Sequence, residues 1–192
     1  MGCSRSFDVV TSAVGIFLSA LLLSACGGGP SIPSQPANCP DGTASTGSTT
    51  AQIDGISWTA VCVPPAGNGV QFGYIDVSAQ DANRHLTFRV HAGGPRDLLG
   101  TVPLTVGTYQ IGGQPSIYGG DSYALIAICS SAASQVCPAW TAQPQLGSGT
   151  VTITTLTDRS ITGTFSFTLV ALSGTGATGS VAITNGNFSV TL

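Results

Sequence analysis

The chain contains no lysine and no glutamate. Its 192 residues carry five basic side chains, all Arg, and eight acidic ones, all Asp, which gives a formal net charge of −3 at pH 7. Nucleic-acid-binding proteins carry a basic patch that neutralises phosphates, and the composition therefore excludes an electrostatic site of that kind. A surface with so few charges depends on Ser, Thr, Asn and Gln for solubility, and it suits uncharged partners such as glycans.

Motifs for catalysis are also missing. There is no Gly-x-Ser-x-Gly elbow, and without Glu a catalytic carboxylate pair would need two of the scattered Asp residues. Gly27-Gly28-Gly29 lacks the Lys and the Ser or Thr that complete a phosphate-binding loop. His85 and His91 lie six residues apart on one predicted strand, ~20 Å, which is too far for both to bind one metal ion. We expect no enzymatic activity, no cofactor and no metal site.

Gly120-Asp121-Ser122 is similar to the nucleophile segment of trypsin-like proteases. However, Tyr123 stands where that segment has glycine, and neither histidine has an Ala-Ala-His-Cys context. A hydrolase, with His and Asp brought within hydrogen-bond reach in a cleft, is therefore the least favoured function.

The N-terminal region has the residue pattern of an export signal. An apolar run from Val9 to Ala25 follows Arg5 and ends in Leu23-Ser24-Ala25-Cys26. This stretch resembles bacterial lipoprotein signal peptides, with the lipobox at their end. The resemblance implies that residues 1–25 are removed and that Cys26 receives lipid, including palmitate. Several acyl chains together anchor a protein far more firmly than one. Gly27 follows the cysteine in place of Asp, which implies the outer membrane of a double-membraned bacterium.

Two alternatives remain for this region. Val9 to Ala25 is close to the ~17-residue lower limit of a spanning helix, so a transmembrane anchor is possible. Met1-Gly2-Cys3-Ser4-Arg5-Ser6 fits the N-myristoylation pattern, with Cys3 beside it for palmitoylation. Both are less favoured, because the chain runs directly into an export signal that ends in a lipobox.

Composition divides the rest of the chain. Residues 26–49 are dominated by Gly, Pro, Ser, Thr and Asn, which predicts a flexible tether because such a segment buries too little apolar area to fold. Residues 50–192 are predicted to form one domain, long enough to enclose a core.

Four cysteines remain for disulfides: Cys39, Cys62, Cys129 and Cys137. In an oxidising compartment an even number predicts two bonds, and four cysteines allow three pairings. We favour Cys129 with Cys137, which closes a short loop, and Cys39 with Cys62, which fixes the start of the domain. Zinc is the alternative, although cysteine zinc sites usually have pairs two to four residues apart.

Apolar and polar residues alternate with period two, which predicts strands. Within Arg84 to His91 the pattern places Leu86, Phe88 and Val90 inward and both histidines on a solvent-facing polar strip. The predicted strands are Ile53–Val63, Val70–Ala79, Arg84–His91, Leu104–Ile111, Ser122–Cys129, Thr150–Thr157 and Ser160–Leu172, and Asp158-Arg159 is the expected hairpin connection between the last two. Seven or more short strands without an amphipathic helix predict an all-β fold: a single antiparallel β-sandwich or a barrel-like domain.

The alternation changes phase at two places. Beside Gly73 the apolar set shifts within Val70–Ala79, which predicts a bulge. Near Asn185-Gly186 the pattern of residues 181–183 is out of phase with that of 188–192. This fits a tight turn or a bulge, and we favour the turn.

Several segments together resemble a group of bacterial envelope lipoproteins of unknown function. They are Ile53-Asp54-Gly55-Ile56-Ser57-Trp58, Gly107-Thr108-Tyr109, Gly149-Thr150-Val151-Thr152-Ile153, Gly163-Thr164-Phe165-Ser166-Phe167 and Thr184-Asn185-Gly186-Asn187-Phe188. The resemblance supports the all-β fold and implies no catalytic residue.

Aromatic residues are the candidates for binding. Trp58 is expected to be buried in the first strand. Trp140, in the predicted loop from Pro138 to Pro144, and Tyr118, in the segment 112–120, are the predicted binding-loop residues. The favoured function is a non-catalytic envelope lipoprotein that binds a partner protein or a glycan, or has a structural role. The alternative is a barrel that carries an apolar ligand in a cavity lined by Leu86, Phe88, Phe165 and Phe167.

Overall fold

The computed structural model describes residues 39, 42–70, 73–92, 102–112, 122–130 and 137–192. These residues contain eleven strands and no α-helix. The strands are β1 Ser48–Ile53, β2 Ile56–Thr59, β3 Gly67–Gly69, β4 Tyr74–Gln80, β5 Arg84–His91, β6 Gly107–Ile111, β7 Tyr123–Ile128, β8 Ala139–Ala142, β9 Ser148–Leu156, β10 Ser160–Ala171 and β11 Ser180–Thr191. The all-β prediction is confirmed.

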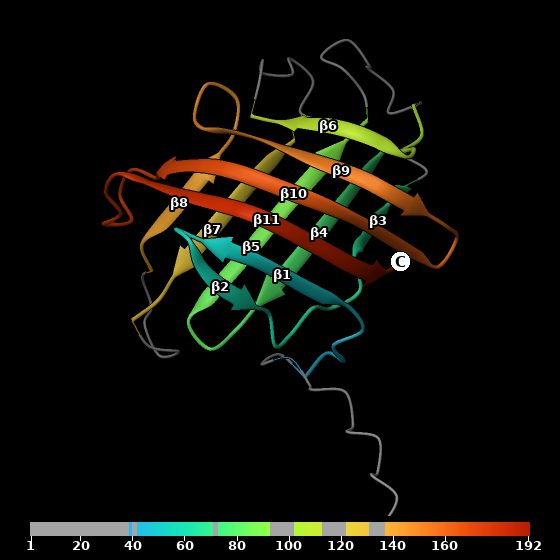
Figure 1. Ribbon diagram of the computed structural model, residues 1–192, viewed down its shortest axis with the longest axis horizontal. Coiled ribbons are helices and arrows are strands. Elements are labelled where there is room, and N and C mark those ends of the chain that lie inside the picture. The colour runs from blue at the N-terminus through green and yellow to red at the C-terminus, as the bar shows by residue number, and fades with distance from the viewer. Residues whose placement is uncertain (1–38, 40–41, 71–72, 93–101, 113–121, 131–136) are drawn as a thin grey trace, which may run out of the picture. The chain divides into compact units, whose positions relative to one another are not determined.

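All strand pairs are antiparallel, in the order β2-β1-β11-β10-β8-β7-β5-β4-β3. The sheet divides at β10, whose residues 161–168 pair with β9, while Val170 and Ala171 pair with β8. β9 in turn pairs with β6. The sheet therefore curls into a half-barrel, and β9, β10, β11 and β1 cross in front of β4, β5, β7 and β8 (Figure 1).

Aromatic rings fill the space between these two groups of strands. Phe88 of β5 lies with its ring centroid 5.2 Å from Phe165, 5.6 Å from Phe167 and 5.4 Å from Phe188. Each of these four side chains is at most 4% exposed. Leu86 and Val90 are fully buried beside Phe88, as the period-two pattern of β5 predicts.

Two disulfides close the domain, and both favoured pairings are confirmed. Cys39 bonds to Cys62, and Cys129 bonds to Cys137. Cys62 also exchanges backbone hydrogen bonds with Gln80 at the end of β4, at 3.0 and 2.9 Å. The first disulfide thus attaches the segment before β1 to Cys62, and through it to the end of β4.

The folded region begins before residue 50, the start predicted from composition. β1 starts at Ser48, and the backbone N–H groups of Thr46 and Gly47 donate to the Val63 carbonyl oxygen. Composition alone predicts a tether here because Gly, Ser and Thr bury little apolar area, whereas backbone hydrogen bonds and a disulfide hold this segment.

The structure corrects two local predictions near the start of the sheet. The predicted strand Ile53–Val63 is interrupted by a turn, because Asp54 and Gly55 adopt positive φ angles of 49° and 79° between the end of β1 and the start of β2. The predicted bulge beside Gly73 is also a turn. Gly73 has φ 77°, and its N–H donates to the Val70 carbonyl oxygen at the end of the β3–β4 hairpin.

The favoured turn at Asn185-Gly186 is wrong, because β11 runs through both residues. One extra β11 residue is accommodated opposite β1 and opposite β10, which defines a bulge. Asn185 has φ 52°, and a Cβ on Gly186 would lie 2.4–2.6 Å from the Phe165 ring. Glycine is therefore needed here so that the ring can pack against the bulge.

One buried polar atom in the core is unpaired. Thr49 of β1 is 1% exposed, and its Oγ1 has no hydrogen-bond partner among the described residues. A buried hydroxyl without a partner costs about 1–3 kcal/mol. We expect Thr49→Val to raise the free energy of unfolding by about 1 kcal/mol, measured by urea titration. Thr50→Val, at the exposed next position, is the control and should change it by less than about 0.5 kcal/mol. Destabilisation by Thr49→Val alone would contradict this account of the hydroxyl.

Candidate functional site

The two predicted binding-loop residues do not form a described site. Trp140 lies in β8, between β7 and β10, and not in a loop. Its indole N–H donates to the Thr178 carbonyl oxygen at 3.0 Å, and its ring packs partly buried against the core. The four-residue strand is too short for a period-two pattern to reveal it, and Pro138 and Pro144 on either side are typical of a loop. Tyr118 lies outside the described residues.

Trp58 is 3% exposed, as expected, although it lies in β2 and not in the first strand. Its indole N–H donates to Asp81 Oδ2 at 2.8 Å. This bond explains how a buried indole satisfies its polar group.

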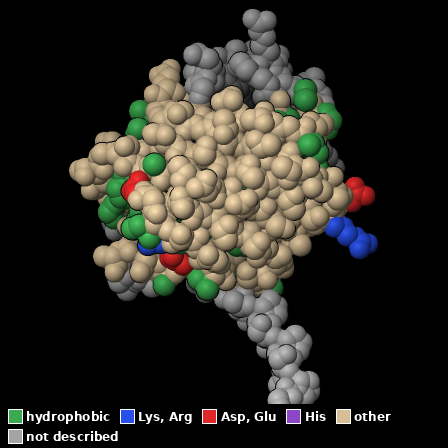
Figure 2. All heavy atoms as spheres, viewed as in Figure 1, with side chains coloured by type: hydrophobic (Ala, Val, Ile, Leu, Met, Phe, Trp, Pro, Cys, Tyr) green, Lys and Arg blue, Asp and Glu red, His purple; other side chains and the backbone are tan. Residues whose placement is uncertain are grey.

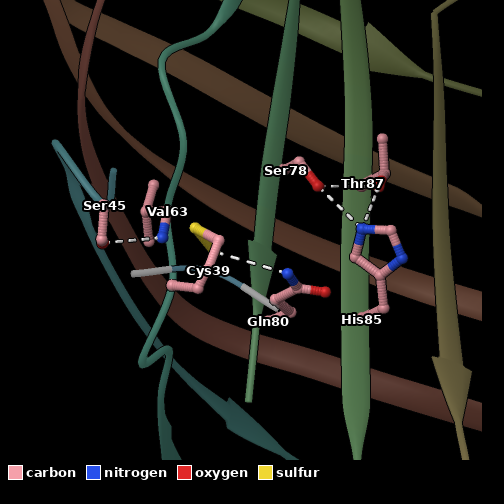
Figure 3. Close-up of a disulfide and its surroundings, with 8 residues drawn as sticks. Cys39, Ser45, Val63, Ser78, Gln80, His85 and Thr87 are labelled. Atoms are coloured by element: carbon pink, nitrogen blue, oxygen red, sulfur yellow. Dashed lines mark hydrogen bonds between the residues drawn. A yellow bond between two sulfur atoms is a disulfide. The ribbon is translucent and has the colours of Figure 1, made fainter. Parts of the chain in front are cut away.

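The outer face of β4 and β5 carries the predicted polar strip. His85, Thr87, Arg89 and His91 alternate with the buried residues of β5. The Oγ of Ser78 on β4 lies 2.7 Å from His85 Nε2, and Thr87 Oγ1 lies 3.3 Å from the same nitrogen (Figure 3). Desolvation by partial burial lowers the pKa of His85 below its ordinary 6.5, which favours the neutral ring at pH 7. The residue as a whole is nevertheless exposed, so water screens much of this effect.

A serine and a histidine at this distance need further parts to act as a nucleophile. Among the described residues, no carboxylate is hydrogen-bonded to His85 to orient the ring. Ser78 lies inside the continuous β4–β5 pairing, where backbone N–H groups form ladder bonds, so they do not converge on an oxyanion. Among the described residues, the pair is therefore part of the polar strip and lacks the partners that activate a serine nucleophile.

A more specific arrangement lies farther along the same strands. Arg89 donates from Nε to Asp76 Oδ1 at 2.7 Å and from Nη2 to Asp76 Oδ2 at 2.6 Å. Its guanidinium carbon lies 5.0 Å from the ring centroid of Tyr74 and 5.6 Å from that of Tyr123. We call these four residues the Arg89 platform. The hydrogen bond to Asp76 is the main cause that raises the pKa of Arg89, so this guanidinium stays charged.

Strand register assembles the platform from three strands. Asp76 of β4 pairs with Arg89 of β5, and Arg89 pairs with Tyr123 of β7. Tyr74 lies opposite Gly69 of β3, where a Cβ would come within 2.2–2.5 Å of the Tyr74 ring. The glycine therefore leaves the space that this ring occupies. Sequence alternation could place Arg89 on the outer face, but it could not bring these residues together.

The outer face of β6, β9 and β10 has a different chemistry, and we call it the hydroxyl face. Thr side chains bond across it, with Thr108 Oγ1 2.9 Å from Thr152 Oγ1 and Thr154 Oγ1 3.1 Å from Thr162 Oγ1. Figure 2 shows this side of the molecule almost without charged side chains except near its margins. A shallow hollow of about 280 Å³ crosses it onto β11, lined by Gln110, Ser148, Thr150, Ser166, Thr168 and Thr184 among others.

The described part of the chain contains no group of three or more His, Cys, Asp or Glu that could hold a metal ion. Nor do these residues include a helix of the length and hydrophobicity that crossing a membrane requires. In comparisons with protein-family models, with curated proteins and with solved structures, none matches this chain.

Proposed function

We propose that this protein is a bacterial envelope lipoprotein, anchored in the outer membrane by lipid on Cys26, whose β-domain binds a glycan or an envelope protein without catalysis. The observation that carries the proposal is Leu23-Ser24-Ala25-Cys26 at the end of an apolar run. A domain with two disulfides agrees with it, because such bonds persist in oxidising compartments.

The surface of the domain supports a binding role. Among its described polar groups, Arg89 and Asp76 form an ion pair whose charges neutralise each other, and the guanidinium lies 5.0 and 5.6 Å from the ring centroids of Tyr74 and Tyr123. The Ser78–His85 pair has no carboxylate partner among the described residues, which argues against a hydrolase.

The packing gives no support to the alternative of an apolar-ligand carrier. That function needs a cavity among Leu86, Phe88, Phe165 and Phe167. Instead, Phe88, Phe165 and Phe167 contact one another with centroids 5.2–5.6 Å apart, and Leu86 is fully buried.

Lipid attachment can be tested by expressing the full chain in a double-membraned bacterium fed an alkyne fatty acid. We expect the wild-type chain to be labelled and to fractionate with the outer membrane. Cys26→Ala should abolish the label, because the thiol that takes the diacylglycerol is gone. Cys3→Ala is the matched control and should keep it, since Cys3 leaves with the signal peptide. Mass spectrometry of the purified chain should show Cys26 as the first residue.

Three results would contradict the proposal. An unlabelled wild-type chain in the membrane fraction would favour a transmembrane anchor. Loss of label in Cys3→Ala together with its retention in Cys26→Ala would favour acylation near the N-terminus.

Gly27→Asp should move the labelled chain to the inner membrane, and an unchanged fractionation would remove the argument for the outer membrane.

A further inference from the structure

The Arg89 platform is a partly exposed, pre-formed arrangement on the outer face of three neighbouring strands. Its guanidinium is fixed by two hydrogen bonds to Asp76 and lies near both tyrosine rings. Asp76 and Arg89 remain partly accessible, with 26% and 34% of their side-chain surface exposed. Neighbouring strands are ~4.8 Å apart, so the row from Asp76 through Arg89 to Tyr123 spans about 10 Å.

We propose that the Arg89 platform binds sugar rings of a neutral glycan, with Tyr74 and Tyr123 packing against the rings and the Arg89–Asp76 pair bonding to their hydroxyls. This inference deepens the proposed function and depends on it, because it names the ligand class and its site.

The paired charges of Arg89 and Asp76 favour a neutral ligand over a charged one. The Arg89 guanidinium and the Asp76 carboxylate neutralise each other through paired hydrogen bonds at 2.7 and 2.6 Å. An anionic ligand would have to compete with Asp76 for the guanidinium, and a cation would have to compete with Arg89 for the carboxylate. The pair still presents donors and acceptors that a sugar hydroxyl can use, because a guanidinium has five N–H groups and a carboxylate about four lone-pair sites.

The aromatic rings and polar groups of the platform match a sugar better than they match a protein surface. A pyranose has an apolar C–H face and a rim of hydroxyls, which matches an aromatic ring beside planar polar groups. A protein interface usually has an apolar centre. The large hydrophobic side chains that are exposed in the described residues are not members of the platform: Ile56, Val61, Val102, Val106 and Leu146.

Rigidity favours binding at low cost. Gly69 leaves room for the Tyr74 ring, Asp76 fixes Arg89, and Arg89 lies 5.6 Å from the Tyr123 ring centroid. A ligand therefore has few side chains to order when it binds. Tyrosine also has only two side-chain torsions, which keeps the entropy loss small.

The test uses the full chain purified from the envelope in detergent and titrated calorimetrically with maltohexaose, cellohexaose, mannohexaose, chitohexaose and, as the acidic probe, hexagalacturonate. We expect at least one neutral hexasaccharide to bind. Tyr123→Ala should raise its Kd about tenfold or more through loss of the packed ring, whereas Tyr123→Phe should stay within about threefold of wild type. The pair Asp76→Asn with Arg89→Gln, which removes both charges together, should also weaken binding.

The hydroxyl face supplies the matched control. Thr150→Ala with Thr168→Ala, both in the hollow, should leave the Kd unchanged. The melting temperature of each variant is measured, and its Kd is interpreted only if that temperature matches the wild-type value, so that a loss of folding is recognised. Absence of binding to every neutral hexasaccharide, preference for hexagalacturonate, or loss of binding only in the hydroxyl-face variant would each overturn the inference. The fatty-acid label is read separately, so the anchor proposal can stand while the platform proposal fails, and the reverse.

Discussion

Phe88→Ala is expected to lower the free energy of unfolding by about 3–5 kcal/mol. Phe88 is fully buried and contacts three aromatic rings, Phe165 and Phe167 of β10 and Phe188 of β11. Its removal costs the transfer of a large apolar side chain and leaves a cavity between the two groups of strands, because neighbouring backbones held in ladders can move in only slightly. Urea titration with a fixed m-value measures the change.

Two variants make this prediction specific. Phe88→Leu keeps much of the volume and should cost clearly less than alanine. Val106→Ala removes two methyl groups from a residue that is 59% exposed and should change the free energy by less than about 0.5 kcal/mol. A cost below about 1 kcal/mol for Phe88→Ala would mean that this ring does not join the two groups of strands.

Removing the disulfides is expected to have unequal effects. Cys39→Ala with Cys62→Ala opens a loop with a sequence separation of 23, and Cys129→Ala with Cys137→Ala opens one with a separation of 8. The loop-entropy relation gives losses of about 3.5 and about 2.6 kcal/mol in the free energy of unfolding. The first pair should cost more for a second reason, since both of its cysteines are at most 4% exposed and Cys62 Sγ accepts a hydrogen bond from Gln80 Nε2 at 3.4 Å.

Each double variant is compared with the wild-type chain by urea unfolding under oxidising conditions. In dithiothreitol the variants should approach the reduced wild type, because the remaining difference is then only that between a thiol and a methyl group. A larger loss for the Cys129 and Cys137 pair than for the Cys39 and Cys62 pair would show that native-state contacts outweigh loop length here.

The sequence predicted the long strands well because one of their faces is buried. β5 has the bounds predicted for it, and β10 differs from its prediction by one residue, since an alternating core pattern over eight or more residues has no helical counterpart. The Asp158-Arg159 connection is also confirmed, with the Thr157 N–H donating to the Ser160 carbonyl oxygen at 2.9 Å across it. The favoured disulfide pairing, which rested on the short loop between Cys129 and Cys137 and on the position of Cys39 and Cys62 at the start of the domain, is confirmed.

Bulges and turns could not be told apart from the sequence. Gly73 and Asn185 both mark a change of alternation and both adopt a positive φ, yet the first lies in a turn and the second in a bulge. Whether the residue lies in a turn or in a bulge depends on which strands pair with the chain before and after it. β11 is held between β1 and β10 through its bulge, whereas the chain at Gly73 reverses to pair β3 with β4.

By itself, the sequence determined the all-β class, the inward face of the long strands and the scarcity of charged side chains, and it led us to expect an export signal. Only the tertiary structure decided that Tyr74, Arg89 and Tyr123 meet, because they lie on three strands separated by up to 49 positions and their contact depends on the register of β4, β5 and β7. Alternation fixes which face a side chain occupies, since its period is two along one strand. The neighbour of that side chain on the next strand is fixed by pairing, which no single strand encodes.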